Sequence, residues 1–157
     1  MEEKARRIIS KNLFMTLASV SMDGEPWSTP VFYATDSTMK KFFWYSRKDT
    51  VHSQNIKSNT KVTASLFSLD GEDAMTGVYL KGYAHEVEET ELDEAIAAYI
   101  AKAAQTDEEK ELLSRKEDFL GDAPLRMYVM EVEECSISGE ASKWNGKWMD
   151  TRENVNL

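Results

Sequence analysis

The chain has 157 residues, enough for one domain with a substantial core. Hydrophobic residues make up 41% of it, which argues against a disordered chain. The formal net charge is −9, from 28 acidic and 19 basic residues, so the chain lacks the excess of positive charge that binding to duplex DNA or RNA requires. We therefore expect no nucleic-acid partner, although a local basic pocket can still hold one small anion.

The sequence also predicts the compartment. Cys135 is the only cysteine, so no intrachain disulfide can form, which fits a reducing environment. Charged residues run through residues 1–11, so we expect no signal peptide. No stretch approaches 18 consecutive apolar residues, so we expect no membrane span. These features predict one cytoplasmic domain over residues 1–157.

The chain alternates between helical and strand-like patterns from its first residues onward. Helical spacing of apolar residues covers four segments: residues 2–12, 50–58, 92–103 and 107–120. Alternation typical of strands covers six segments: residues 13–21, 26–34, 41–46, 60–69, 76–88 and 125–137. Residues 70–75 are predicted to be a loop, and residues 138–157 have no clear period.

Several local signals refine this pattern. The Asp23-Gly24 turn predicts a hairpin between the first two strands. Pro30 indicates that the second strand is an edge or contains a bulge, and Gly82 marks a bulge or a close approach in the fifth strand. Thr90 is predicted to cap the third helix. Tight turns favour antiparallel pairing, and a sheet of this size must close or be covered, which predicts a small barrel with appended helices.

One segment, residues 42–56, combines features that an anion site needs. An aromatic strand runs into a turn rich in hydroxyl and basic side chains, and a helix capped by Asp49 or Thr50 follows. Helix N-terminal amides attract anions, and Arg, Lys and hydroxyl groups add direct hydrogen bonds. The ordinary alternative is a solvated hairpin exit followed by a capped helix. From this segment alone the ordinary alternative is favoured.

Several segments are informative through the order in which they follow one another along the chain: residues 14–20, 23–31, 43–47, 50–56, 61–66 and 80–84. In this order they resemble the pyridoxamine 5′-phosphate oxidase-like family, the FMN-binding split β-barrels. The resemblance implies a mainly β fold with short helices, built as an antiparallel six-stranded split β-barrel. It also implies an FMN-dependent oxidoreductase, a small-molecule substrate, and a homodimer whose two subunits both contact the flavin.

The resemblance implies roles for residues on two strands. Ser28 and Thr29, on the second strand, correspond to positions along the isoalloxazine ring. Tyr45 and Ser46, at the end of the third strand, correspond to positions at the ribityl chain or the phosphate.

It also implies a phosphate site at the following helix. The family commonly has a Ser or Thr and, two positions later, a Lys at the phosphate; here these positions are Thr50 and His52. Histidine has an uncertain charge near pH 7, so the site departs from the pattern. Arg47 and Lys48 are expected to compensate for the missing lysine.

The remaining candidates are weaker. Trp144 and Trp148 either lie near the flavin of the partner subunit, as an aromatic C-terminal segment does in related proteins, or pack on the barrel. His52 and His85 have no metal-ligand spacing, so we expect no metal site, and Cys135 is expected to be a buried inert thiol. No residue is marked as a general acid or base, so the catalytic residues stay unassigned. The alternatives are a non-catalytic flavin-binding or ligand-sensing dimer, or a relative that uses deazaflavin or haem.

Overall fold

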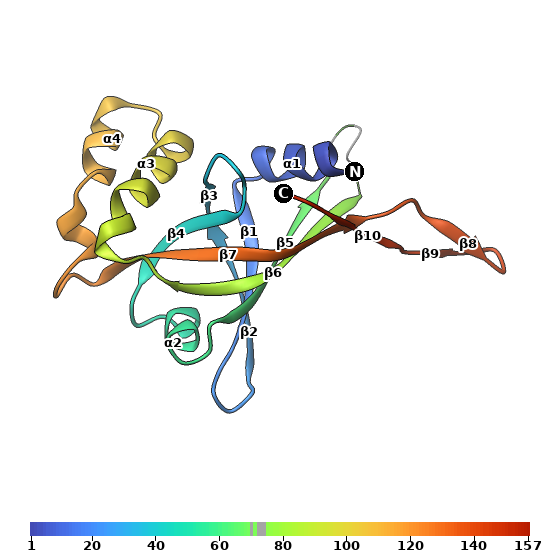
Figure 1. Cartoon of the computed structure of the whole chain (residues 1–157), viewed down its shortest axis with the longest axis horizontal. Helices are drawn as coiled ribbons and strands as arrows, with labels where there is room; N and C mark the ends of the chain where they lie inside the picture. Colours follow the sequence, from blue (N-terminus) through green and yellow to red (C-terminus); the bar gives the residue numbers. More distant parts are fainter. Residues whose placement is uncertain (70, 72–74) are drawn as a thin grey trace.

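A computed structural model describes residues 1–69, 71 and 75–157 of the chain. The described residues form a mainly antiparallel sheet of eight strands, with the order β2-β1-β5-β6-β7-β4-β3 and with β10 paired to β7 (Figure 1). The strands of the chain are β1 (Phe14–Val20), β2 (Pro26–Phe32), β3 (Ala34–Thr35), β4 (Lys41–Arg47), β5 (Lys61–Ser68), β6 (Thr76–Glu86), β7 (Leu125–Ser138), β8 (Ser142–Trp144), β9 (Lys147–Met149) and β10 (Arg152–Val155).

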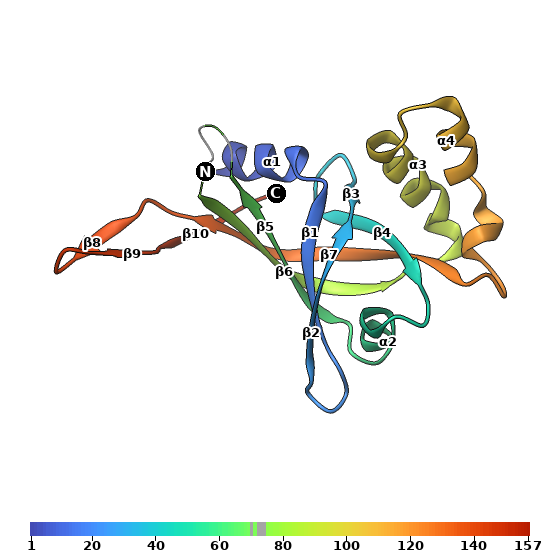
Figure 2. The ribbon, with the colours of Figure 1, turned by 180° about the vertical axis from the view of Figure 1, so that it is seen from behind.

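The helices lie around this sheet. They are α1 (Glu2–Lys11), α2 (Val51–Ser58), α3 (Leu92–Ala103) and α4 (Asp107–Leu113), with the short 3₁₀ helices η2 (Glu89–Glu91) and η3 (Lys116–Phe119). In both views of the ribbon α1 and α2 lie at opposite ends of the barrel, and α3 and α4 form a separate layer against β4 (Figures 1 and 2). None of the described helices is long and apolar enough to cross a membrane.

The sheet curls because two strands that are adjacent in the chain, β2 and β3, form its two opposite edges. β2 and β3 stand at opposite ends of the strand order, yet only Tyr33 separates them in the chain. The Tyr33 side chain is fully buried, and its hydroxyl donates a hydrogen bond to Ile9 O over 2.6 Å. Lys102 Nζ lies 3.6 Å above the Tyr33 ring and donates to Asn12 O over 2.7 Å. These contacts fix the C-terminal end of α1 and close a split barrel, so the predicted fold class is confirmed.

The alternation of β4 divides the apolar interior in two. Phe42 and Trp44 point into the barrel and belong to its core, whereas Phe43 points to the other face and packs with α3. The same alternation continues to the end of the strand, where it sends Tyr45 and Ser46 to opposite faces. This separation matters for the site described below.

The six predicted strands are confirmed as β1, β2, β4, β5, β6 and β7. Pro30 lies on the edge strand β2, as predicted. The register of β6 against β7 shifts between Lys81 and Gly82, and a Cβ at Gly82 would lie 1.9 Å from Glu131 O. The predicted irregularity at Gly82 is therefore confirmed, and its cause is the close approach of a backbone carbonyl.

The helix predictions need two corrections. Thr90 does not cap α3, because the chain first makes the 3₁₀ turn η2 and α3 then begins after Glu91, which makes no side-chain cap. The predicted helix over 107–120 ends at Leu113, because the chain turns to bury Phe119. A capping box does form at the start of α4, between Thr106 and Glu109.

The last twenty residues are more ordered than their sequence pattern indicated. β8 and β9 form a hairpin around Asn145 and Gly146, both with positive φ, and β10 returns to pair with β7. Asn-Gly is a strong hairpin signal, but strands of only three residues are too short to show a clear alternation. Residues 70 and 72–74 of the predicted loop lie outside the described residues.

Candidate functional site at the N-terminus of α2

Helix α2 begins where the sequence predicted an anion site. Thr50 is its cap, rather than Asp49: Thr50 has extended backbone angles, and its Oγ1 accepts a hydrogen bond from Ser53 N over 3.4 Å. The amides of Val51 and His52 have no helical acceptor, because the first turn of a helix has none. These amides and the helix dipole make the start of α2 electropositive.

Four polar side chains surround this helix start, and we name them the hydroxyl cage: Ser46, Thr50, His52 and Ser53. His52 Nε2 lies 2.8 Å from Ser46 Oγ and 3.2 Å from Thr50 Oγ1. Thr50 Oγ1 lies 2.8 Å from Ser53 Oγ. His52 and Ser53 are buried. The cage therefore brings three hydroxyl groups and an imidazole to the first turn of α2.

The charge of His52 determines how strongly the cage attracts an anion. Burial lowers the pKa of His52 below its ordinary value of 6.5. The imidazole is therefore neutral at pH 7 in the free protein and hydrogen-bonds to its neighbours without adding positive charge. The cage offers hydrogen-bond donors, but it lacks the fixed cation that a lysine would bring.

Neither of the neighbouring basic residues, Arg47 and Lys48, replaces that cation. Arg47 makes a two-fold ion pair with Asp49, with Nε–Oδ1 and Nη2–Oδ2 distances of 2.9 and 2.6 Å. This pair lowers the pKa of Asp49, and both side chains are exposed, so the charge of Arg47 is already balanced at the surface. Lys48 turns away from the cage, and its Nζ lies 3.4 Å from Asp122 O.

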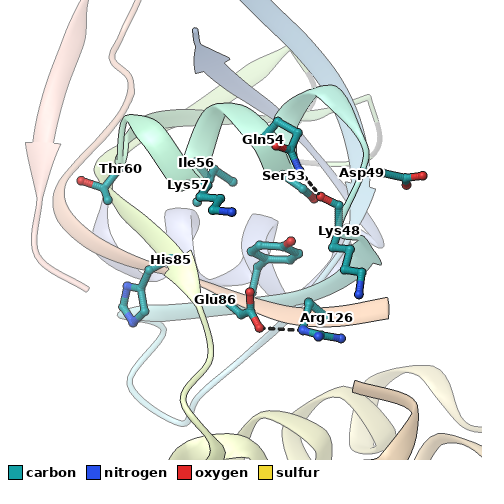
Figure 3. Close-up of a pocket in the computed structure, with 11 residues that line it drawn as sticks. Lys48, Asp49, Ser53, Gln54, Ile56, Lys57, Thr60, His85, Glu86 and Arg126 are labelled. Carbon is teal, nitrogen blue, oxygen red and sulfur yellow. Dashed lines mark hydrogen bonds and ion pairs between the residues drawn. The ribbon is translucent and has the colours of Figure 1, made fainter. Parts of the chain in front are cut away.

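Lys48 instead lines a pocket between α2 and the ends of β6 and β7, which we name the α2 pocket (Figure 3). Its volume is about 600 Å³. The lining residues are Lys48, Asp49, Ser53, Gln54, Ile56, Lys57, Thr60, His85, Glu86, Arg126 and Tyr128. Ser53 lines this pocket and also belongs to the hydroxyl cage, so the two share one side chain.

Within one chain, the other predicted flavin contacts lie elsewhere. Tyr45 is on the opposite face of β4 from Ser46, with its ring 5.1 Å from that of Tyr99 and 5.8 Å from that of Phe119. Ser28 and Thr29 are on the edge strand β2, where Ser28 is exposed and Thr29 is half-buried. The structure therefore brings Ser46, Thr50 and His52 together and leaves the remaining predicted contacts apart from them.

Trp144 and Trp148 lie on the β8–β9 hairpin, which extends away from the barrel in both ribbon views (Figures 1 and 2). Their side chains are 64% and 68% exposed. Lys143 Nζ lies 4.3 Å from the centre of the Trp148 ring. The two tryptophans therefore do not pack on their own barrel, which was one of the two predicted alternatives.

Sequence reasoning missed the residues that come from β6 and β7. Arg126 reaches this region because it pairs across the sheet with Ser46, and Glu86 pairs with Tyr128. Neither pairing has a local signal, since 80 residues separate Ser46 from Arg126 in the chain. Lys57 was within reach of prediction, because it lies one helical turn after Ser53. Cys135 is buried as expected, and burial raises its pKa to about 11.

The chain belongs to the pyridoxamine 5′-phosphate oxidase family, whose sequence pattern matches residues 1–136. A search of curated proteins found no significant match.

Solved structures share the fold at low sequence identity. A haem-binding protein from Mycobacterium smegmatis has a TM-score of 0.68 and 21% identity; the match covers 96% of this chain and 57% of that one. A FAD-binding protein from Mesorhizobium loti has a TM-score of 0.65 and 14% identity, over 87% of this chain and 93% of that one. HutZ, the haem storage protein from Vibrio cholerae, has a TM-score of 0.65 and 17% identity, over 84% and 89%. At these identities the likeness shows the fold alone.

Proposed function

We propose that the chain is an FMN-binding protein of the oxidoreductase type, and that the hydroxyl cage holds the phosphate of the flavin. The observation that carries this proposal is the set of hydroxyls at the start of α2, beside first-turn amides that have no helical acceptor, in a chain of this family. The flavin, when bound, supplies electron or hydride transfer to a small-molecule substrate. The chain supplies the position and the surroundings of the flavin.

The residues of the cage have distinct tasks in this proposal. Ser46, Thr50 and Ser53 donate hydroxyl hydrogen bonds to phosphate oxygens, together with the first amides of α2. His52 orients the hydroxyls of Ser46 and Thr50 through its Nε2. Lys48 adds a positive field at longer range, whereas the charge of Arg47 is balanced by Asp49.

The rest of the proposed flavin site is assembled by a homodimer. In this arrangement Ser28 and Thr29 lie along the isoalloxazine ring, whereas Tyr45, which packs against Tyr99 and Phe119 on the other face of β4, is not assigned to the ribityl chain. We also propose that Trp144 and Trp148, on the exposed β8–β9 hairpin, contact the flavin of the partner subunit. Residues 1–157 act as one domain, and we assign no catalytic residue.

Haem is the second candidate ligand, because the proteins of similar fold include one that binds haem and one that stores it. Deazaflavin, or flavin binding without turnover, belongs to the same set of alternatives. Absorption spectra of the purified chain with added FMN, deazaflavin or haem distinguish the ligands. Reduction of the bound flavin by NAD(P)H, followed by reoxidation by an acceptor, distinguishes an enzyme from a binding protein.

The phosphate position is tested by calorimetric titration of the full chain with FMN. Thr50→Ala removes a hydroxyl of the cage, and we expect about tenfold weaker binding. Arg47→Ala is expected to weaken binding by less than about threefold, because Asp49 already balances this charge and surface pairs contribute little.

Thr106→Ala is a matched control for Thr50→Ala. Thr106 caps α4 through the same kind of side-chain hydrogen bond, outside the cage. Both substitutions remove a helix cap worth about 1 kcal/mol of stability, but only Thr50→Ala should change FMN affinity. Equal affinity in Thr50→Ala and in the unmodified chain would place the phosphate outside the cage.

A further inference from the structure

The α2 pocket gathers positive charge in an acidic chain. Lys48, Lys57 and Arg126 lie around it, with Asp49 and Glu86 as the acidic residues (Figure 3). The side chains come from the β4–α2 turn, from α2 itself and from the ends of β6 and β7. The net charge of the whole chain is −9, so the pocket has a higher proportion of basic side chains than the chain as a whole.

Both acids in the pocket are neutralised by arginines. Arg126 Nε lies 2.7 Å from Glu86 Oε1, and Asp49 is held by Arg47. The Arg126 guanidinium also donates to three carbonyls in the turn before β7 and at the first residue of that strand, which fixes it in place: those of Gly121, Ala123 and Leu125. Among the described residues, neither Lys48 nor Lys57 forms an ion pair, although Lys48 lies near enough to Asp49 to help lower the pKa of that carboxyl. Two ammonium groups are therefore left to attract an anion.

The inner wall of the pocket is apolar and belongs to the barrel core. Ile56 and Tyr128 are 2% and 3% exposed, and the Tyr128 ring stacks on Trp44 with a centroid distance of 5.8 Å. A volume of about 600 Å³ is within the range of sites for small organic ligands. An apolar wall beneath a cationic rim suits a molecule with an apolar body and an anionic head group.

We propose that the α2 pocket is a second binding site, separate from the hydroxyl cage, for a small organic anion. Lys48 and Lys57 hold its carboxylate or phosphate group, and Ile56 and Tyr128 contact its apolar body. This site does not depend on flavin binding. Ser53 connects the two sites, because it lines the pocket and hydrogen-bonds to Thr50 in the cage.

The proposal is tested by NMR titration of the ¹⁵N-labelled full chain, without flavin, at constant ionic strength. Sodium benzoate and sodium phosphate are the two probes, so that the carboxylate and the phosphate head groups are compared separately. We expect saturable shifts of the amide signals of Lys57, Thr60 and His85 with at least one probe. Absence of saturable shifts at these residues with both probes would overturn the proposal.

Two exposed lysines provide the matched variants. Lys57→Gln should weaken binding of the active probe about tenfold. Lys81→Gln, which removes an exposed lysine on the sheet away from the pocket, should leave it unchanged. Equal probe affinity in Lys57→Gln and the unmodified chain would overturn the proposal.

The two proposals fail independently. Lys57→Gln should keep its FMN affinity, since Lys57 is not part of the cage. If FMN does not bind while a probe still saturates the pocket, the proposed flavin function fails and the pocket stands. If FMN binds but neither probe does, the pocket fails and the flavin function stands.

Discussion

Replacing His52 by lysine tests the cage directly, because it restores the residue that the family commonly has at this position. His52 is buried, and burial lowers its pKa, so the imidazole is uncharged at pH 8. His52→Lys adds an ammonium group close to Ser46 Oγ and Thr50 Oγ1, which lie 2.8 and 3.2 Å from the present Nε2. We expect FMN binding to become tighter.

The expected gain follows from the type of contact that is added. A hydrogen bond to a charged group contributes ~1.5–3 kcal/mol, and 1.4 kcal/mol corresponds to a tenfold change in affinity. Desolvation of the ammonium group reduces this gain, so we expect about tenfold tighter binding. The free protein should lose ~1–2 kcal/mol of stability, because a buried charge replaces an imidazole that is hydrogen-bonded to two hydroxyls.

The assay is calorimetric titration with FMN at pH 8, together with thermal unfolding of the free protein. His52→Gln is the control, since it keeps a polar side chain without the charge, and its FMN affinity should stay within about threefold of the unmodified chain. A folded His52→Lys variant that binds FMN no more tightly than the unmodified chain would refute the position assigned to the phosphate.

Three further predictions concern pH and the frame that holds the site. The pKa of His52 is lowered in the folded protein, so its contribution to stability is complete above pH 6.5 and is lost as the pH falls through the folded pKa; unfolding titrations should show this loss, and His52→Gln should lack it. Gly82→Ala places a Cβ 1.9 Å from a backbone carbonyl of β7 and should lower the free energy of unfolding, measured by chemical denaturation, by ~3 kcal/mol or more. The control is Gly24→Ala, which has no atom within 4 Å but a positive φ and should cost only ~1–2 kcal/mol. Equal losses in the two variants would contradict the close approach at Gly82. Tyr33→Phe leaves the carbonyl of Ile9 without its buried partner and should lower the free energy of unfolding by ~1–3 kcal/mol. In thermal unfolding each kcal/mol corresponds to a fall in Tm of roughly 2–4 °C. Tyr83→Phe, at an exposed tyrosine, is the control and should change stability little.

The fold was predictable wherever its signals are local. The alternation of apolar residues and the turn signals located all six long strands, and Pro30 and Gly82 correctly marked an edge and an irregularity. The crossing of the chain at Tyr33 was not predictable, because the hydrogen bond from its hydroxyl to Ile9 joins residues 24 positions apart. Thr90 failed as a cap because its capping pattern falls within a 3₁₀ turn.

The part of the site that lies close together in the sequence was also predictable, because its signals are local. Thr50 and His52 come together with Ser46 because a strand, a turn and a helix follow one another directly. The orientation of Tyr45 away from Ser46 follows from strand alternation, which places neighbouring residues of a strand on opposite faces. Arg126 depends on the pairing of β4 with β7, which only the folded chain defines.

The most direct test of the flavin proposal compares the affinities of the full chain for FMN and for riboflavin, which lacks the phosphate. If the hydroxyl cage binds that phosphate, FMN should bind at least about tenfold more tightly than riboflavin, since charge-assisted hydrogen bonds are lost with it. Thr50→Ala should reduce this difference. Equal affinities for the two flavins, or no binding of either, would contradict the proposed role of the cage.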